Sequence, residues 1–287
     1  MVENMLKASA NPCIKFNMKS TIFIIPIVIV IGVLVYILSL IILGGLKALN
    51  LDLLFTSIMY GGIFEAIIGT FLLLVGTSIL ALPISIATAI YLTEYAPKGG
   101  KTVKIIEQSI DNLAGLPSIV VGLFGYEFFV KMLGFGVSLL SGWLTLLIMV
   151  IPIVTKATKE AILMVPEEFR KVASALGATK WDIIRDIILP ISMPGIASGI
   201  ILGMARISGE TAAILFTACT LTARGIPATP LEPIISLSYY LFVVIFTSPG
   251  SAYTKAYALA TILMSITVSL YSIAIIVRFH YRKRKRW

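Results

Sequence analysis

Residues 164–190 read MVPEEFRKVASALGATKWDIIRDIILP, a charged stretch between two strongly apolar ones. Several of its apolar residues recur at intervals of four, three and four, which places them on one face of a helix. The residues of this face are Val165, Phe169, Val172 and Leu176. Gly177 follows them, where a left-handed residue can end the helix. An amphipathic helix between apolar segments predicts a loop to which a soluble partner docks.

Local signals divide the loop into two short helices. Pro166 suits the first position of the first helix, and Glu167 and Glu168 favour the positive end of its dipole. Thr179 and Asp182 have the spacing of a capping box, which opens a second helix before the next apolar run. The alternative is a helix that rests in the lipid headgroups. Anionic lipid repels the carboxylates of the loop, which argues mildly against this alternative, and from periodicity alone both interpretations stay open.

Outside this loop the composition is that of a membrane protein. The chain of 287 residues is 58% hydrophobic and 13% charged, with a mean hydropathy of +1.00. A run of about 20 apolar residues is long enough to cross the hydrocarbon core of a bilayer. Six such spans are expected: Thr21–Gly44, Ile63–Thr93, Ser109–Leu133, Val137–Val154, Ile187–Leu221 and Tyr257–Val277. The membrane domain then covers residues 21–277, between an amino-terminal tail (1–20) and a basic tail (278–287).

Lysine and arginine set the orientation of these spans, because they accumulate on the cytoplasmic side of a membrane. Both tails and the loop 164–190 share this excess, so we expect all three in the cytoplasm of a multi-pass plasma-membrane protein. The net charge is +9, but the basic tail 278–287 directly follows a span, which predicts binding to anionic lipid and not to nucleic acid. Cys13 and Cys219 fall on opposite sides and are not expected to pair, and the lone His280 indicates no metal site.

The fifth span carries charge at membrane depth. Five residues at steps of four, four, three and four share one helix face: Gly195, Gly199, Gly203, Arg206 and Glu210. Glycines at this spacing let another helix pack closely. An ionised side chain in a bilayer costs about 2.5–3.5 kcal/mol on insertion scales, so it faces protein or water. Two interpretations stay open: Arg206 and Glu210 neutralise each other, or the guanidinium binds a tetrahedral oxyanion in transit while Glu210 sets its strength and orientation.

Four segments and one spacing resemble a known family. The segments are ARISGETAAILFT (205–217), LAGLPSIVVGLFG (113–125), GGIFEAIIGT (61–70) and YLTEYAP (91–97). The spacing joins Gly177 to Ile187, Leu189 and Pro190, and it resembles the loop by which ABC importer permeases hold their ATPases. The two longest segments resemble the phosphate importer permeases of the PstA kind. The similarity runs over about residues 61–278, the expected permease core.

The resemblance implies an all-helical type I ABC importer permease with six transmembrane helices and a cytoplasmic coupling helix pair. It implies an ATP-driven phosphate importer with two permease chains, ATP-binding subunits and an extracytoplasmic phosphate-binding protein. By position, Arg206 and Glu210 become the charged residues of the substrate pathway. The residues expected to dock the ATPase are Val165, Glu168, Phe169, Val172, Leu176 and Gly177. Pro117 and Ser118 are implied packing or gate residues, and Pro117 fits a plain helix kink equally well.

The loop departs from the family at one point. Where the family has Glu-Ala-Ala, this chain has Lys171, Val172 and Ala173, so a base replaces the acid. Glu168, one turn earlier, is the candidate to replace that acid. No G-x-x-x-x-G-K-[ST] stretch accompanies the loop, so ATP is expected to be used by the partner and no cofactor by this chain. The chain is then a transport subunit and not an enzyme.

Other functions remain as alternatives. A permease for another oxyanion, sulfate or molybdate, fits the residues as well, and only the family segments favour phosphate. An ATP-independent anion channel or transporter explains Arg206 and Glu210 but leaves the docking loop without a role. A membrane-embedded enzyme would need a cluster of histidine, cysteine or carboxylate residues that the sequence lacks. The outer run Ile234–Phe246 is too short to cross, so it either contacts a binding protein or covers the mouth of the bundle.

Overall fold

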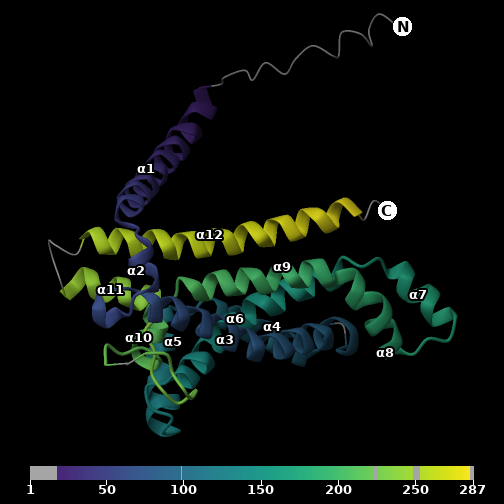
Figure 1. The fold of residues 1–287 in the computed structure, drawn as a ribbon. Coiled ribbons are helices and arrows are strands. Elements are labelled where there is room, and N and C mark those ends of the chain that lie inside the picture. Colours follow the sequence, from purple (N-terminus) through teal and green to yellow (C-terminus); the bar gives the residue numbers. More distant parts are fainter. Residues whose placement is uncertain (1–17, 98, 223–224, 248–252, 285–287) are drawn as a thin grey trace, which may run out of the picture.

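The computed structural model describes residues 18–97, 99–222, 225–247 and 253–284 (Figure 1). Within these ranges the chain is all-helical, and its one isolated bridge joins Cys219 and Ile234. Five helices are long and apolar enough to cross a membrane, or six if one bent pair counts as a single span. Cys13, the first 17 residues and residues 285–287 of the basic tail lie outside the described ranges.

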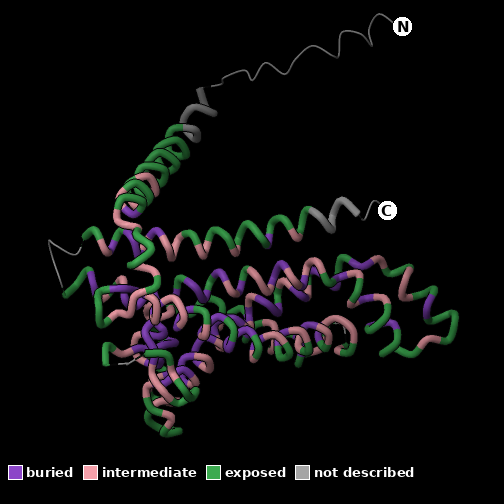
Figure 2. Tube along the Cα trace, in the orientation of Figure 1, coloured by how far each residue is buried: buried purple, intermediate pink, exposed green. Residues whose placement is uncertain are grey.

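Five long helices form the body of the molecule. They are α1 (Met18–Ala48), α3 (Phe64–Ile90), α6 (Leu139–Leu163), α9 (Leu189–Ser208) and α12 (Tyr253–Arg284). Helix α6 packs between α3 and α9, α12 lies along α9, and α1 reaches the rest chiefly through α12 (Figure 1). Buried positions gather on α3, α6 and α9, whereas α1 is exposed along most of its length (Figure 2). An apolar helix exposed on all sides is stable against lipid or another protein chain, and not in water.

Short helices and helical turns connect the long ones. The short helices are α2 (Leu51–Phe55), α4 (Lys101–Ala114), α5 (Ser118–Gly125), α7 (Glu167–Ala175), α8 (Lys180–Asp182), α10 (Ala212–Thr217) and α11 (Leu237–Thr247). A 3₁₀ turn, η2 (Ile58–Tyr60), precedes α3. Three π-helical turns continue α3 and α5 and lead into α9: η3 (Tyr91–Tyr95), η4 (Tyr126–Met132) and η5 (Ile183–Ile188).

Two buried clusters hold these elements together. The larger one joins α3, α6, α10 and α11, and its centre includes Leu74, Leu146 and Ile214, each at most 2% exposed. The smaller one joins the ends of α3 and α6 to the loop that follows α6. Its members are Ala89, Ile162, Val165, Ala173, Ile183, Ile184 and Ile188. The loop predicted for docking therefore rests on an apolar core of its own.

The expected third span is broken. Helix α4 and the α5–η4 column meet at 101°, so the expected span Ser109–Leu133 is a bent pair of helices and not one continuous helix. Pro117 lies just before α5 with an extended ψ of 135°. A proline disfavours helical backbone at the preceding residue, and its own missing N–H suits the start of a helix. Gly115 and Pro117 therefore end one helix and begin another, which is a sharper change than a kink.

The predicted second coupling helix and the fifth span are one helix. Elements α8, η5 and α9 run without a break from Lys180 to Ser208, so the second helix, predicted to be short, is the first part of the fifth span. Pro190 removes a backbone hydrogen bond and crowds the carbonyl of Asp186, which normally breaks a helix. Here the π-helical turn η5 precedes α9 and locally rearranges the hydrogen-bond ladder, so the helix continues through Pro190.

Other span boundaries also differ from the prediction. Helix α9 ends at Ser208 instead of Leu221, because Gly209 follows it and the chain turns before α10. Helix α6 continues past Val154 to Leu163. The last helix continues through the first part of the basic tail to Arg284.

The outer run Ile234–Phe246 enters the bundle. The backbone N–H of Thr220 donates to Ile234 O over 3.1 Å, and that of Ile234 donates to Ala218 O over 3.0 Å. Leu237 N donates to Thr70 Oγ1 on α3 over 2.9 Å, and Ile234 is 1% exposed. This burial favours the covering role, because the segment closes the end of the bundle opposite the loop.

Candidate functional site: the docking loop and the charged pair

Local residue choices define the ends of α7. Pro166 stands just before the helix with an extended ψ of 141°, one position earlier than predicted. Gly177 has the predicted left-handed backbone, with φ of +82°. The predicted capping box is present: Thr179 N donates to Asp182 Oδ2 over 3.0 Å, and Asp182 N donates to Thr179 Oγ1 over 3.3 Å. These contacts fix the turn between α7 and the helix that begins at Lys180.

The first residue of the predicted docking face is buried. Val165 is 3% exposed and packs in the smaller core with Ile162 and Ile184, so its assignment to an exposed docking face is wrong. The reason is that α7 begins only at Glu167, so Val165 precedes the helix and does not follow its periodicity. Phe169, one turn into α7, is partly buried.

The rest of the face points outward. Val172 and Leu176 are 60% and 83% exposed, and Trp181, across the glycine turn, is 55% exposed. We call these three residues the exposed apolar set. Glu168 and Lys171 are also exposed. Lys171 stands where the family has an acidic residue, and Glu168 is the candidate to replace that residue. The loop thus presents large apolar side chains among charges, at the tip of the molecule occupied by α7 and α8 (Figure 1).

The three glycines of α9 face α6. A Cβ at Gly195 would lie 2.5 Å from Ala161 Cβ, and one at Gly199 would lie 2.5 Å from Ala157 Cβ. A Cβ at Gly203 would lie 3.1 Å from Val154 Cγ2. The glycine positions therefore permit a close packing of α9 on α6 that larger side chains would prevent.

Arg206 and Glu210 form a loose pair at the far end of α9. The helix ends at Ser208, so Glu210 does not continue its face as predicted. Arg206 Nε lies 3.9 Å from Glu210 Oε2. The arginine side chain is 53% exposed, whereas the glutamate side chain is 8% exposed. Ser238 Oγ on α11 donates to the backbone carbonyl of Glu210 over 2.7 Å, which holds the glutamate in the bundle.

The two implied gate residues lie at the bend of the third span. Pro117 is exposed and Ser118 is partly buried. Gly122, one turn further along α5, faces the backbone of Ala212 and Ala213 on α10. Packing at this bend is therefore carried by the glycine, and Pro117 itself sets the direction of the chain.

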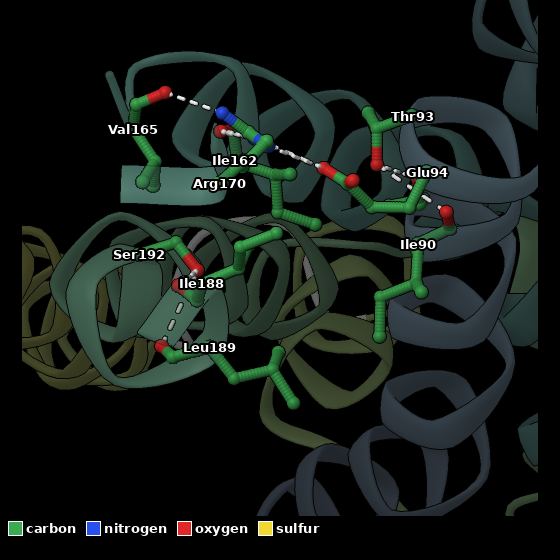
Figure 3. Close-up of polar contacts among 10 residues, drawn as sticks. Ile90, Thr93, Glu94, Ile162, Val165, Arg170, Ile188, Leu189 and Ser192 are labelled. Atoms are coloured by element: carbon green, nitrogen blue, oxygen red, sulfur yellow. Dashed lines mark hydrogen bonds and ion pairs between the residues drawn. The ribbon is translucent and has the colours of Figure 1, made fainter. Parts of the chain in front are cut away.

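A salt bridge that the sequence did not predict joins the loop to α3. Arg170 Nη2 on α7 donates to Glu94 Oε1 in η3 over 2.9 Å, and the same guanidinium reaches backbone carbonyls at the end of α6 (Figure 3). The side chains are 21% and 11% exposed. Nothing in the spacing of two residues 76 positions apart indicates such a pair. The available signal was a polar residue, Glu94, at the end of a long apolar run.

Two further ion pairs join α4 to α6. Lys156 Nζ lies 2.6 Å from Asp111 Oδ1, and Lys159 pairs with Glu107. They explain how two lysines can lie on α6 beyond the predicted end of its span. No group of three metal-ligating side chains occurs in the part of the chain that the structure describes.

The structure combines several membrane-length helices with an exposed amphipathic loop at one end and the Arg206–Glu210 pair at the other. Residues 81–285 match the family described as binding-protein-dependent transport system inner membrane component, and the chain belongs to this family. In structure it is similar to a chain of a bacterial ABC transporter involved in the import of the acidic polysaccharide alginate, with a TM-score of 0.62 at 18% identity over 92% of this chain and 96% of that one. The MetNI methionine transporter gives a TM-score of 0.57 at 14% identity, over 77% of this chain and 95% of that chain. The fold is therefore that of a type I ABC importer permease.

Sequence relatives carry a more specific name. Phosphate transport system permease protein PstA 1 of Mycobacterium tuberculosis is 41% identical over 155 residues, which are 54% of this chain and 50% of the relative. The match thus spans about half the length of that relative. Phosphate transport system permease protein PstA of Haemophilus influenzae is 33% identical over 270 residues, or 90% of this chain and 91% of the relative.

Proposed function

We propose that this chain is the permease subunit of an ATP-driven importer of inorganic phosphate. It forms the transmembrane pathway with a second permease chain and binds separate ATP-binding subunits through α7. The names of the mycobacterial and Haemophilus relatives support phosphate as the substrate. The sequence contains no phosphate-binding glycine loop of the G-x-x-x-x-G-K-[ST] type, which supports a permease that uses the ATPase of a partner.

The observation that carries the coupling part is the exposed apolar set. Val172, Leu176 and Trp181 project from a loop that is held on its other side by buried Val165 and Ala173. A helix that is anchored on one side and apolar on the other suits docking into a groove of another protein. Burial of such side chains contributes roughly 1.5–3 kcal/mol each. With α7 on the ATPase side, both termini lie in the cytoplasm and the segment after α10 faces the phosphate-binding protein.

Arg206 is the proposed contact for the anion. Its side chain is half exposed at the far end of α9, while the partner that balances its charge, Glu210, is buried. A planar guanidinium can donate two hydrogen bonds to two oxygens of a tetrahedral anion, which a lysine cannot match. Phosphate, sulfate and molybdate share this geometry, so the residues select the class of anion and the relatives favour phosphate within it.

Uptake by the reconstituted complex tests this assignment. The chain is co-expressed with its second permease and ATPase, placed in liposomes with the phosphate-binding protein, and supplied with radiolabelled phosphate. We expect uptake that requires ATP and that excess sulfate or molybdate does not suppress. Uptake without ATP would support an anion channel instead. Suppression by sulfate or molybdate would move the substrate to that oxyanion.

A further inference from the structure

One guanidinium joins three elements at the loop end of the bundle. Arg170 Nε and Nη2 both donate to Glu94 Oε1, over 3.3 and 2.9 Å. Its Nη1 donates to Val165 O over 2.6 Å, and Nη2 also donates to Ile162 O over 3.1 Å. Figure 3 shows this contact, which we call the Arg170 clasp: Arg170 with Glu94, Ile162 and Val165.

The acceptors of the clasp suit a guanidinium better than the ammonium group of a lysine. Ile162 lies in the last turn of α6, where backbone carbonyls carry the negative end of the helix dipole. Its carbonyl also accepts from the backbone N–H of Val165 over 3.1 Å. Glu94 lies in η3, the π-helical turn that ends the α3 column. The guanidinium of Arg170 donates to both the Ile162 carbonyl and the Glu94 carboxylate, because it has five donors in a fixed plane. A lysine would offer one ammonium and could not span the same three acceptors.

The apolar burial of α7 against its own chain is limited. Of its nine residues, all within the described ranges, Ala173 alone is buried. A cavity of about 670 Å³ opens beside the clasp, lined by residues of both sides such as Thr93, Glu94, Pro166, Arg170 and Lys180. The clasp crosses this cavity with hydrogen bonds. It adds a directional polar link to the apolar contact that Ala173 of α7 makes in the smaller core, which also contains Ala89 of α3 and Ile162 of α6.

We propose that Arg170 and Glu94 are positioning residues that pass the movement of the docked ATPase from α7 to α3 and α6. The inference rests on the proposed function, since it needs an ATPase on α7. A displacement of α7 pulls on the ends of both spans through one rigid group, because the ion pair is largely shielded from water and keeps its strength. Loss of either side chain weakens the link between the spans and α7 but leaves the exposed apolar set in place for docking.

The test compares Arg170→Gln, Glu94→Gln and the double variant in the reconstituted complex. Two quantities are measured: recovery of the ATPase with the permease, and phosphate transported per ATP hydrolysed. We expect the ATPase to be retained in all three, while the transport ratio falls about fivefold or more, the lower range of coupling between distant sites. The double variant should transport no less than Arg170→Gln, because the two side chains act as one unit. Arg185→Gln, an exposed cation in the same loop with 72% side-chain exposure, is the matched control and should keep the wild-type ratio.

Several results would overturn the clasp. They are an unchanged ratio in Arg170→Gln, additive losses in the double variant, and loss of the ATPase together with transport. If Arg170→Gln does not accumulate in the membrane, Glu94→Gln decides alone, because it is nearly isosteric and leaves both carbonyl hydrogen bonds intact. Failure of the proposed function has a separate signature: the wild-type chain would then neither retain an ATPase nor transport phosphate.

Discussion

Arg206 and Glu210 lie 3.9 Å apart between Nε and Oε2, yet they occupy unlike surroundings. More than half of the arginine side chain is exposed, and only 8% of the glutamate side chain is. A buried carboxylate needs its positive partner, whereas an exposed guanidinium can reach water or a ligand without it. The two residues are therefore not equivalent halves of a neutral pair.

Arg206→Gln should stop phosphate uptake. The variant keeps hydrogen-bonding capacity but loses the charge that attracts an anion into a site of low dielectric constant. We expect uptake to fall at least about tenfold, equivalent to about 1.4 kcal/mol, while the assembled complex still hydrolyses ATP. Glu210→Gln should lose less, since it leaves the site more positive. Radiolabelled phosphate uptake and complex recovery are measured for both.

The double variant Arg206→Gln/Glu210→Gln separates this role from mere charge neutralisation. If the pair only neutralises itself, each single variant should assemble poorly and the double variant should recover both assembly and uptake. If Arg206 serves the anion, the double variant assembles but does not transport. Normal uptake by Arg206→Gln would exclude the pathway role.

Leu176→Asp should release the ATPase. Leu176 is 83% exposed, so the substitution does not disturb the fold of this chain. It would place a carboxylate in the apolar groove of the partner, at a cost of several kcal/mol. Co-purification of the ATPase with the permease measures the loss. The matched control is Leu231→Asp, 57% exposed in the segment after α10, and equal loss in both variants would refute docking by α7.

Gly199→Ala should destabilise the bundle. The new Cβ would lie 2.5 Å from Ala157 Cβ, so α6 and α9 would have to separate. Overpacking of this kind typically costs about 1–3 kcal/mol. Thermal unfolding in detergent should show a lower midpoint, and Ala157→Gly should restore it. Gly32→Ala on α1, where a Cβ meets nothing within 4 Å, should leave the midpoint unchanged.

Cys219 should resist alkylation. Its thiol lies in the larger core, and burial raises the pKa of Cys219 to about 12 from an ordinary value of 9.0. A thiol pKa that is higher by about three lowers the thiolate fraction near neutral pH about 1,000-fold. The thiolate is the form that reacts with an alkylating reagent. In a Cys13→Ser background, a water-soluble maleimide should label the folded chain far more slowly than the denatured chain. Equal rates would show that the segment around Cys219 opens to water.

The same shift in pKa predicts a dependence of stability on pH. The folded pKa of Cys219 exceeds the unfolded one, so its contribution is fully present below pH 9 and is lost as the pH rises toward 12. Cys219→Ser, which does not ionise, should weaken the fall in unfolding midpoint over this range. An identical fall in both proteins would assign it to other groups.

Hydropathy predicted most of the spans because lipid requires long apolar helices, whatever their neighbours. Short-range chemistry likewise predicted the left-handed Gly177 and the capping box of Thr179 and Asp182, since each depends on residues a turn apart. The break at Gly115 and Pro117 was missed because apolar residues continue across it. The uninterrupted passage through Pro190 was missed for the opposite reason, since a proline normally ends a helix and the π-helical turn has no sequence signature.

The placement of functional side chains was less predictable. Periodicity put Val165 with Val172 and Leu176, although the helix starts after it and the smaller core takes it up. The Arg170 clasp depends on the tertiary arrangement of three elements, and a single sequence carries no record of which distant residues meet. Proximity of Arg206 and Glu210 followed from their spacing, but their unequal burial depends on α11, which folds back over the glutamate.

The unbroken helix from Lys180 to Ser208 has a mechanical consequence. Its 29 residues make a rod about 44 Å long at 1.5 Å per residue, with Trp181 near one end and Arg206 near the other. The helix has no loop along its length, so under the proposed function a tilt at the docking end reaches Arg206 through continuous backbone. Pro190 and the π-helical turn η5 are the points at which this helix can bend. A rotation of about 10° about one end would sweep the other through roughly 8 Å, more than the width of a phosphate ion.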